Sequence, residues 1–222
     1  MTVILVLTTF LIFILVDYFL VRKKAVSAVV TAKVAPRLAT AGDYVEGFLV
    51  PENLGYHPGH SWLHRERLHV VKIGMDEFSA ALAGRIDKIE LPKPGHWLRQ
   101  GQKAWTLLRG TDKAEMVSPI EGEIVEVNSE VVNDPSLLRK DPYGKGWLMT
   151  VFVPDEESTG RNLLPKSLVR SWMRNAVEKL YAMQPQVAGA VAADGGRPAE
   201  DLFATLPAGT SWSQVAREFF LT

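Results

Sequence analysis

The stretch LHVVKIGMDEFSAALAGRIDKIELPKPG, residues 68–95, decides the fold class of this chain. It opens with alternating apolar and polar residues, which is typical of a β-strand. DEFSAALAG (76–84) predicts a short helix that ends at Gly84, and RIDKIEL (85–91) alternates again before a PKPG turn. Four more segments show the strand pattern: 103–108, 114–120, 122–128 and 146–153. Short strands separated by Gly and Pro turns predict a mainly β sandwich or barrel.

The composition excludes several classes of function. The 222 residues carry 25 basic and 25 acidic side chains, so no overall positive field attracts nucleic acid, and we expect no nucleic-acid partner. There is no cysteine, which excludes disulfides, thiolate metal sites and cysteine nucleophiles. The sequence has no glycine-rich phosphate loop, nucleophile elbow or paired-carboxylate pattern. We therefore expect a non-catalytic subunit or carrier rather than an enzyme.

The N-terminus predicts a membrane anchor over residues 1–24. Residues 2–21 contain one charge, Asp17, and as a helix would rise roughly 30 Å, the thickness of a bilayer core. Basic residues follow at 22–24, so the positive-inside rule predicts a single-pass protein of the cell (inner) membrane with a cytoplasmic C-terminal domain. A cleaved signal peptide is the alternative, but the basic segment that begins one is missing. Asp17 either reaches the membrane interface or bonds to a partner's transmembrane helix.

The remaining chain divides into three parts. We expect a connector over 25–55, a folded domain over 56–183, and a linker with a short apolar helical tail over 184–222. Apolar residues at helical spacing over 163–183 predict a helix that closes the domain. Three large apolar side chains of the tail are candidate partner contacts: Trp212, Phe219 and Phe220. The tail either packs on its own domain or docks on another subunit.

The middle of the chain, about residues 56–155, resembles the H protein of the glycine cleavage system. The matching pieces are His60-x-Trp62, Gly74-x-Asp76, Leu91-Pro92 with Gly95, Gly101, Pro119 with Gly122-Glu123, and Asp141-Pro142-Tyr143-Gly144 with Gly146-Trp147. The resemblance implies a lipoyl-domain-like flattened β-barrel with small helices. It also implies a β-hairpin whose tip presents a lysine that carries a lipoyl group.

The expected lipoyl-lysine position is occupied by another residue. The family pattern places that lysine between the glycine matched by Gly101 and the proline matched by Pro119, and the spacing needs no gap and leads to Thr111. Lys113, in the sequence TDKA, is the alternative attachment site if the turn slides by two residues, a shift that leaves the faces of the strands unchanged. RGTD (109–112) has the better turn chemistry, because Gly allows a positive φ and Asp bonds locally. We therefore expect no lipoyl cofactor, with Lys113 as the alternative site.

Three neighbouring histidines invite a metal hypothesis. His57, His60 and His64 lie close in sequence, and two histidines four residues apart on a helix can bind zinc. Pro58 and Gly59 intervene here, so the segment is expected to be extended, and we predict no metal site.

Three functions remain open from the sequence, and the third of them is an H-like module that binds a small ligand where the arm would rest. The first is a membrane-anchored relative of the H protein without a lipoyl arm, acting as a structural or docking subunit of a cytoplasm-facing membrane complex. The second is a carrier that uses a lipoyl group on Lys113 for aminomethyl or acyl transfer. These first two functions predict other protein subunits and the membrane as partners.

Overall fold

The computed structural model describes residues 8, 11–16, 18, 42–184, 199 and 201–221. The chain has two compact units, Met1–Val34 and Ala35–Thr222, and the β-sheets lie within the second. In the first unit, Thr8, residues 11–16 and Tyr18 are helical. Over the described residues, no helix has both the length and the apolar character needed to cross a bilayer. Most of the predicted span 2–21, Asp17 included, lies outside the described residues.

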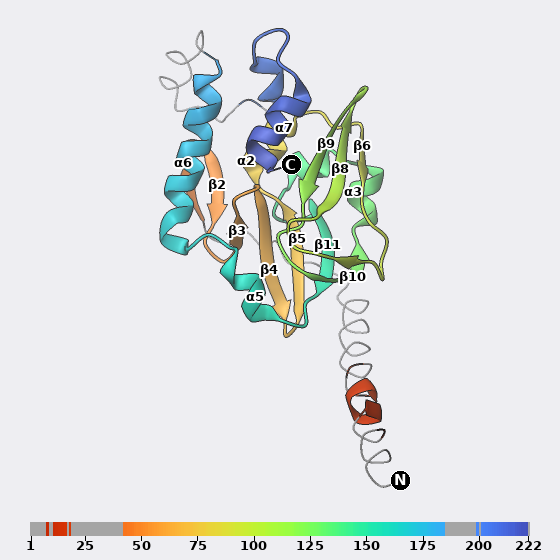
Figure 1. Cartoon of the computed structure of the whole chain (residues 1–222). Coiled ribbons are helices and arrows are strands. Elements are labelled where there is room, and N and C mark those ends of the chain that lie inside the picture. Colours follow the sequence, from red (N-terminus) through yellow and green to blue (C-terminus); the bar gives the residue numbers. More distant parts are fainter. Residues whose placement is uncertain are drawn as a thin grey trace. The chain divides into compact units, whose positions relative to one another are not determined.

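Three antiparallel sheets are formed by the strands that the structure describes (Figure 1). β1 (Gly42–Val45) pairs with β2 (Phe48–Pro51). The largest sheet has, in spatial order, β3 (Gly55–His57), β4 (Ser61–Arg67), β5 (Val70–Met75), β11 (Trp147–Phe152), β10 (Gly122–Val127) and β7 (Trp97–Leu98). The third has β6 (Lys88–Glu90), β8 (Lys103–Arg109) and β9 (Asp112–Val117).

The two larger sheets share one hydrophobic core. Trp62 and Ile73 from the six-stranded sheet and Trp105 and Leu107 from the three-stranded sheet belong to the same buried cluster. This arrangement confirms the prediction of a mainly β fold with small helices. The predicted strand at 85–91 is reduced to β6, because the residues before Lys88 form a bend rather than a ladder.

The helix predicted over 76–84 is confirmed as α2 (Glu77–Ala83). The carboxylate of Asp76 caps its start by accepting a hydrogen bond of 2.7 Å from the Ser79 amide. Gly84 ends it with a φ of 63°, a left-handed value that glycine adopts without a steric penalty. The local sequence therefore determines both ends of α2.

Of the other helices in the second unit, α3 and α4 lie between β10 and β11, and the rest come after β11. α6 confirms the helix predicted over 163–183, and it begins directly after Pro165. Residue bounds are α3 Ser129–Asn133, α4 Leu137–Lys140, α5 Glu156–Arg161, α6 Lys166–Ala182, the 3₁₀ helix η1 Phe203–Thr205 and α7 Trp212–Phe220. The β1–β2 hairpin lies within the stretch expected as a connector, so the folded unit begins earlier in the chain than position 56.

The C-terminal segment, residues 201–221, packs on its own domain (Figure 1). Trp212, Phe219 and Phe220 are 1%, 4% and 0% exposed. The Phe219 ring lies 5.6 Å from the ring of Phe78 in α2. Of the two alternatives that the sequence left open, the structure has the tail folded back. A partner contact by these three side chains would require the segment to leave the domain.

Candidate functional site

The hairpin between β8 and β9 is the element that the sequence singles out. Arg109 pairs with Asp112, so Gly110 and Thr111 alone form the turn. Gly110 has a φ of 57°, and a two-residue hairpin turn needs a positive φ at its first position when it follows the type II′ geometry. The Asp87 carboxylate accepts a hydrogen bond of 2.6 Å from the Gly110 amide. The turn is therefore short and held from the β6 side.

Thr111 and Lys113 occupy different environments on this hairpin. Thr111 is the exposed second residue of the turn, while Lys113 is exposed on β9 with its Cα opposite Leu108. The next residue of β9, Ala114, faces the core. The turn therefore has a hydroxyl side chain, and the Lys113 amine lies two residues further along, on a paired strand.

An ion pair lies beside Lys113 on the same hairpin. Lys103 pairs with Glu115 across the two strands. The hydrogen bond from Lys103, together with the charges of Lys103 and Lys113, lowers the pKa of Glu115 despite its slight burial. Lys113 is therefore a second positive charge near Glu115, in addition to Lys103.

A lipoyl group does not fit the turn as it stands. The lipoyl carboxyl is joined to protein through an amide with a lysine amine, and the turn offers the Gly110 backbone and the Thr111 hydroxyl. Lys113 offers an amine, but from within β9, where its backbone is part of the β8–β9 ladder. The residues present thus disagree with the cofactor that the family resemblance implies at this position.

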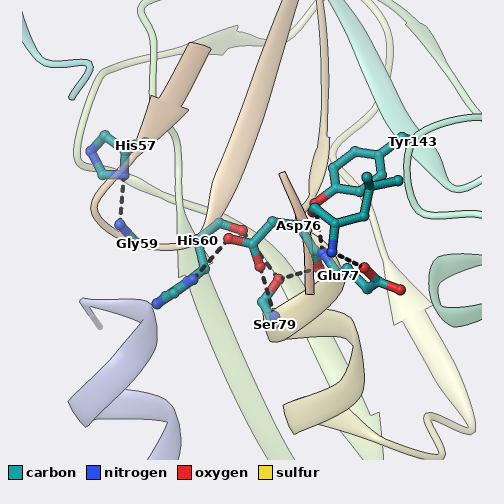
Figure 2. Close-up of polar contacts among 8 residues, drawn as sticks. His57, Gly59, His60, Asp76, Glu77, Ser79 and Tyr143 are labelled. Carbon is teal, nitrogen blue, oxygen red and sulfur yellow. Dashed lines mark hydrogen bonds and ion pairs between the residues drawn. The ribbon is translucent and has the colours of Figure 1, made fainter. Parts of the chain in front are cut away.

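The three histidines do not converge. His60 Nδ1 lies 2.8 Å from the Asp76 carboxylate, and His57 Nδ1 accepts a hydrogen bond of 3.1 Å from the Gly59 amide (Figure 2). His64 lies further along β4. No group of three His, Cys, Asp or Glu side chains is positioned to hold a metal ion in the described part of the chain. Burial, reinforced by the nearby His60, lowers the pKa of His57.

His60 and Asp76 belong to a buried network that positions α2 (Figure 2). The His60 ring is stacked 4.4 Å from the Trp172 ring of α6, measured between ring centres. The Glu77 amide donates to the Tyr143 hydroxyl at 3.1 Å, and that hydroxyl donates to the Leu49 carbonyl at 2.7 Å. Burial, with nearby negative charge, raises the pKa of Tyr143 well above its usual range, so it remains a donor. The network therefore joins β2, α2, α6 and the loop before β11.

Residues that sequence reasoning missed also hold the hairpin. Asp87 bonds the turn directly, and Arg109 reaches Asp201 at 2.9 Å across 92 positions of sequence. The RIDKIEL pattern indicated a strand for Asp87, and no local signal connects Arg109 with the tail. Asp17, the remaining candidate contact, lies outside the described residues.

The fold and the hairpin define the chain as a lipoyl-type, mainly β module that presents a short turn to solvent. Residues 54–175 match the family described as glycine cleavage H-protein. The chain is 35% identical to the glycine cleavage system H protein of Thermobifida fusca over 107 residues, which covers 48% of this chain and 84% of that one. It is 36% identical to the Streptomyces coelicolor H protein over 106 residues, covering 48% and 85%.

A further relative and a solved structure are also similar to this chain. The probable glycine cleavage system H protein 2 of Sulfolobus acidocaldarius is 30% identical over 124 residues, 54% of this chain and 83% of that one. The crystal structure of the Mycobacterium marinum H protein aligns with a TM-score of 0.44 and 26% identity over 47% of this chain and 87% of that chain. The chain belongs to the glycine cleavage H-protein family. The sequence resemblance is therefore confirmed.

Proposed function

We propose that this chain is an H-protein family member without a lipoyl arm, serving as a docking subunit of a complex at the cytoplasmic face of the membrane. The observation that carries the proposal is the Gly110-Thr111 turn, where a hydroxyl stands at the position expected for the modified amine. The threonine hydroxyl is not the amine that a lipoyl amide requires. Family membership supports a carrier-type or docking module rather than a catalyst.

The membrane part of the proposal rests on the apolar run 2–21 and the basic residues that follow it. We expect the full chain to stay in the membrane fraction after an alkaline carbonate wash. Recovery in the supernatant would remove the anchor from the proposal while leaving the hairpin argument intact.

A second function is favoured by one observation. Lys113 is exposed and only two residues from Thr111, so its amine is accessible to a modifying enzyme. A lipoyl carrier that uses Lys113 would transfer an aminomethyl or acyl group. The pairing of Lys113 with Leu108 counts against it, because the lysine then lies on the side of the hairpin and not at its end.

Intact-mass spectrometry distinguishes these functions. The full-length chain is purified in detergent from cells that lipoylate their own proteins, and the expected mass is unmodified. A lipoyl increment that disappears in Lys113→Ala, but persists in Lys103→Ala on the same hairpin, would establish the carrier function instead. Thr111→Lys returns an amine to the turn, and its modification would show that the assay detects a lipoyl group on this hairpin.

Docking is tested on the assembly itself. We expect the chain, extracted in mild detergent, to migrate as a complex larger than its monomer. Thr111→Trp, at the exposed turn, should weaken that complex, whereas Leu68→Ser, at the exposed β4–β5 turn, should not. A monomer in all three preparations would contradict the docking proposal.

A further inference from the structure

The C-terminal segment lies beyond the part of the chain that matches the family. The match ends at residue 175, whereas the segment spans residues 201–221. It nevertheless contacts β9 and lies beside the β8–β9 hairpin (Figure 1). An element outside the matched part of the chain therefore lies next to the hairpin at which the family resemblance places an arm.

Arg109 is the residue through which the two elements meet. It is the last residue of β8, directly before the turn. Its Nη1 donates to the Asp201 carboxylate at 2.9 Å and to the Ala83 carbonyl at 3.0 Å. Its guanidinium carbon lies 4.9 Å from the centre of the Phe203 ring, within the range of a cation–π contact. One side chain thus joins the hairpin to the end of α2 and to the C-terminal segment.

The C-terminal segment also completes α2. The last carbonyls of a helix have no partner within the helix, and a buried helix end needs partners from elsewhere. The Leu202 amide donates to the Ala81 carbonyl at 2.9 Å. A Cβ on Gly84 would lie 2.2 Å from the Asp201 carboxylate, so the glycine at this helix end leaves the space that Asp201 occupies. The contact is therefore built into the helix end as well as the hairpin.

The Asp201 carboxylate accepts hydrogen bonds from Arg109 and from the Ala204 amide. Burial raises the pKa of this carboxyl, but hydrogen bonds from Arg109 and from the Ala204 amide outweigh burial and lower it. Arg109 and Asp201 are 23% and 24% exposed, so solvent screens the pair only in part. Further along, α7 places Phe219 against Phe78, and Glu218 pairs with Lys179 of α6. The segment is thereby anchored at both ends.

We infer that the C-terminal segment holds the β8–β9 hairpin in one orientation, with Arg109 as the positioning residue. Asp87 restrains the same turn at Gly110, so the two contacts together limit movement of the hairpin.

Hydrogen exchange measured by mass spectrometry on the full-length chain in detergent tests the inference without a partner. Asp201→Asn removes the charge while preserving the shape of the side chain. Loss of a partly buried ion pair should speed exchange of the 103–117 amides roughly fivefold and leave β4 and β5 unchanged. Glu115→Gln is the matched control, because it removes an ion pair on the same hairpin that does not involve the C-terminal segment. Equal exchange in the two variants would overturn the inference.

A second pair of variants decides the outcome if Asp201→Asn loosens the whole domain. Arg109→Lys keeps a cation that can reach Asp201, whereas Arg109→Met keeps only the apolar part of the side chain. Slow hairpin exchange in Arg109→Lys and fast exchange in Arg109→Met would support the inference, and identical exchange would overturn it. The proposed function is tested separately, by the intact mass and by the size of the complex. It therefore stands or fails independently of the hydrogen-exchange result for the hairpin.

Discussion

Phe219→Ala tests whether the C-terminal segment is an integral part of the domain. Phe219 is 4% exposed, and its ring packs against Phe78 and beneath the Lys179 ammonium group. Truncating a buried phenylalanine to alanine removes its burial free energy and leaves a cavity, which together cost about 3–5 kcal/mol. In a domain of this size that loss lowers the melting temperature by roughly 10 °C.

Thermal unfolding of the full-length chain in detergent, followed by circular dichroism, measures the effect. Leu221→Ala is the matched control, because Leu221 is 51% exposed two residues further along the same segment. The control should change the unfolding free energy by less than about 0.5 kcal/mol. If Phe219→Ala changes the unfolding free energy as little as Leu221→Ala does, the C-terminal segment is not packed in the core. It then cannot restrain the hairpin.

Three further predictions concern the buried elements. Gly74→Ala places a Cβ 2.3 Å from the Trp62 ring, and we expect a loss of about 3 kcal/mol or more in urea titrations; a wild-type midpoint would refute the close packing. Asp76→Ala removes the cap of α2 and leaves the buried His60 without its partner, which should cost about 2–4 kcal/mol by the same measurement, and a loss below about 1 kcal/mol would contradict that role. His57 has a lowered pKa, so its contribution to stability is complete above its ordinary value of 6.5 and falls as the pH drops below it, because the unfolded chain then binds the extra proton. In urea titrations across this range, His57→Gln should lose less stability than the wild type, and an equal loss would contradict the role of His57.

Family membership does not by itself determine the chemistry of the β8–β9 hairpin. Trp62 is buried in the core, and Asp76 and Gly84 mark the two ends of α2. Thr111 affects only the chemistry at an exposed turn, so its identity leaves the fold unchanged. A fold of this type therefore persists whether or not its turn can carry a cofactor.

Local sequence determined the elements whose signals lie within a few residues. Asp76 and Gly84 mark the two ends of α2 because an aspartate side chain bonds the first free amides and glycine accepts a left-handed backbone. The turn at 110–111 follows from Gly110 and from the alternation of the flanking strands, which permits one set of faces toward the core. These features depend on residues that are close together in the chain, so they can be predicted from the sequence.

Tertiary structure alone decided where the C-terminal segment goes and how the hairpin is held. The apolar residues Trp212 and Phe219 predict burial but do not specify the surface that buries them, because the hydrophobic effect is not directional. The pairing of Arg109 with Asp201 joins residues 92 positions apart, and each alone reads as an ordinary surface charge. Only the folded chain brings the end of α2, the hairpin and the tail close enough for one guanidinium group to connect all three.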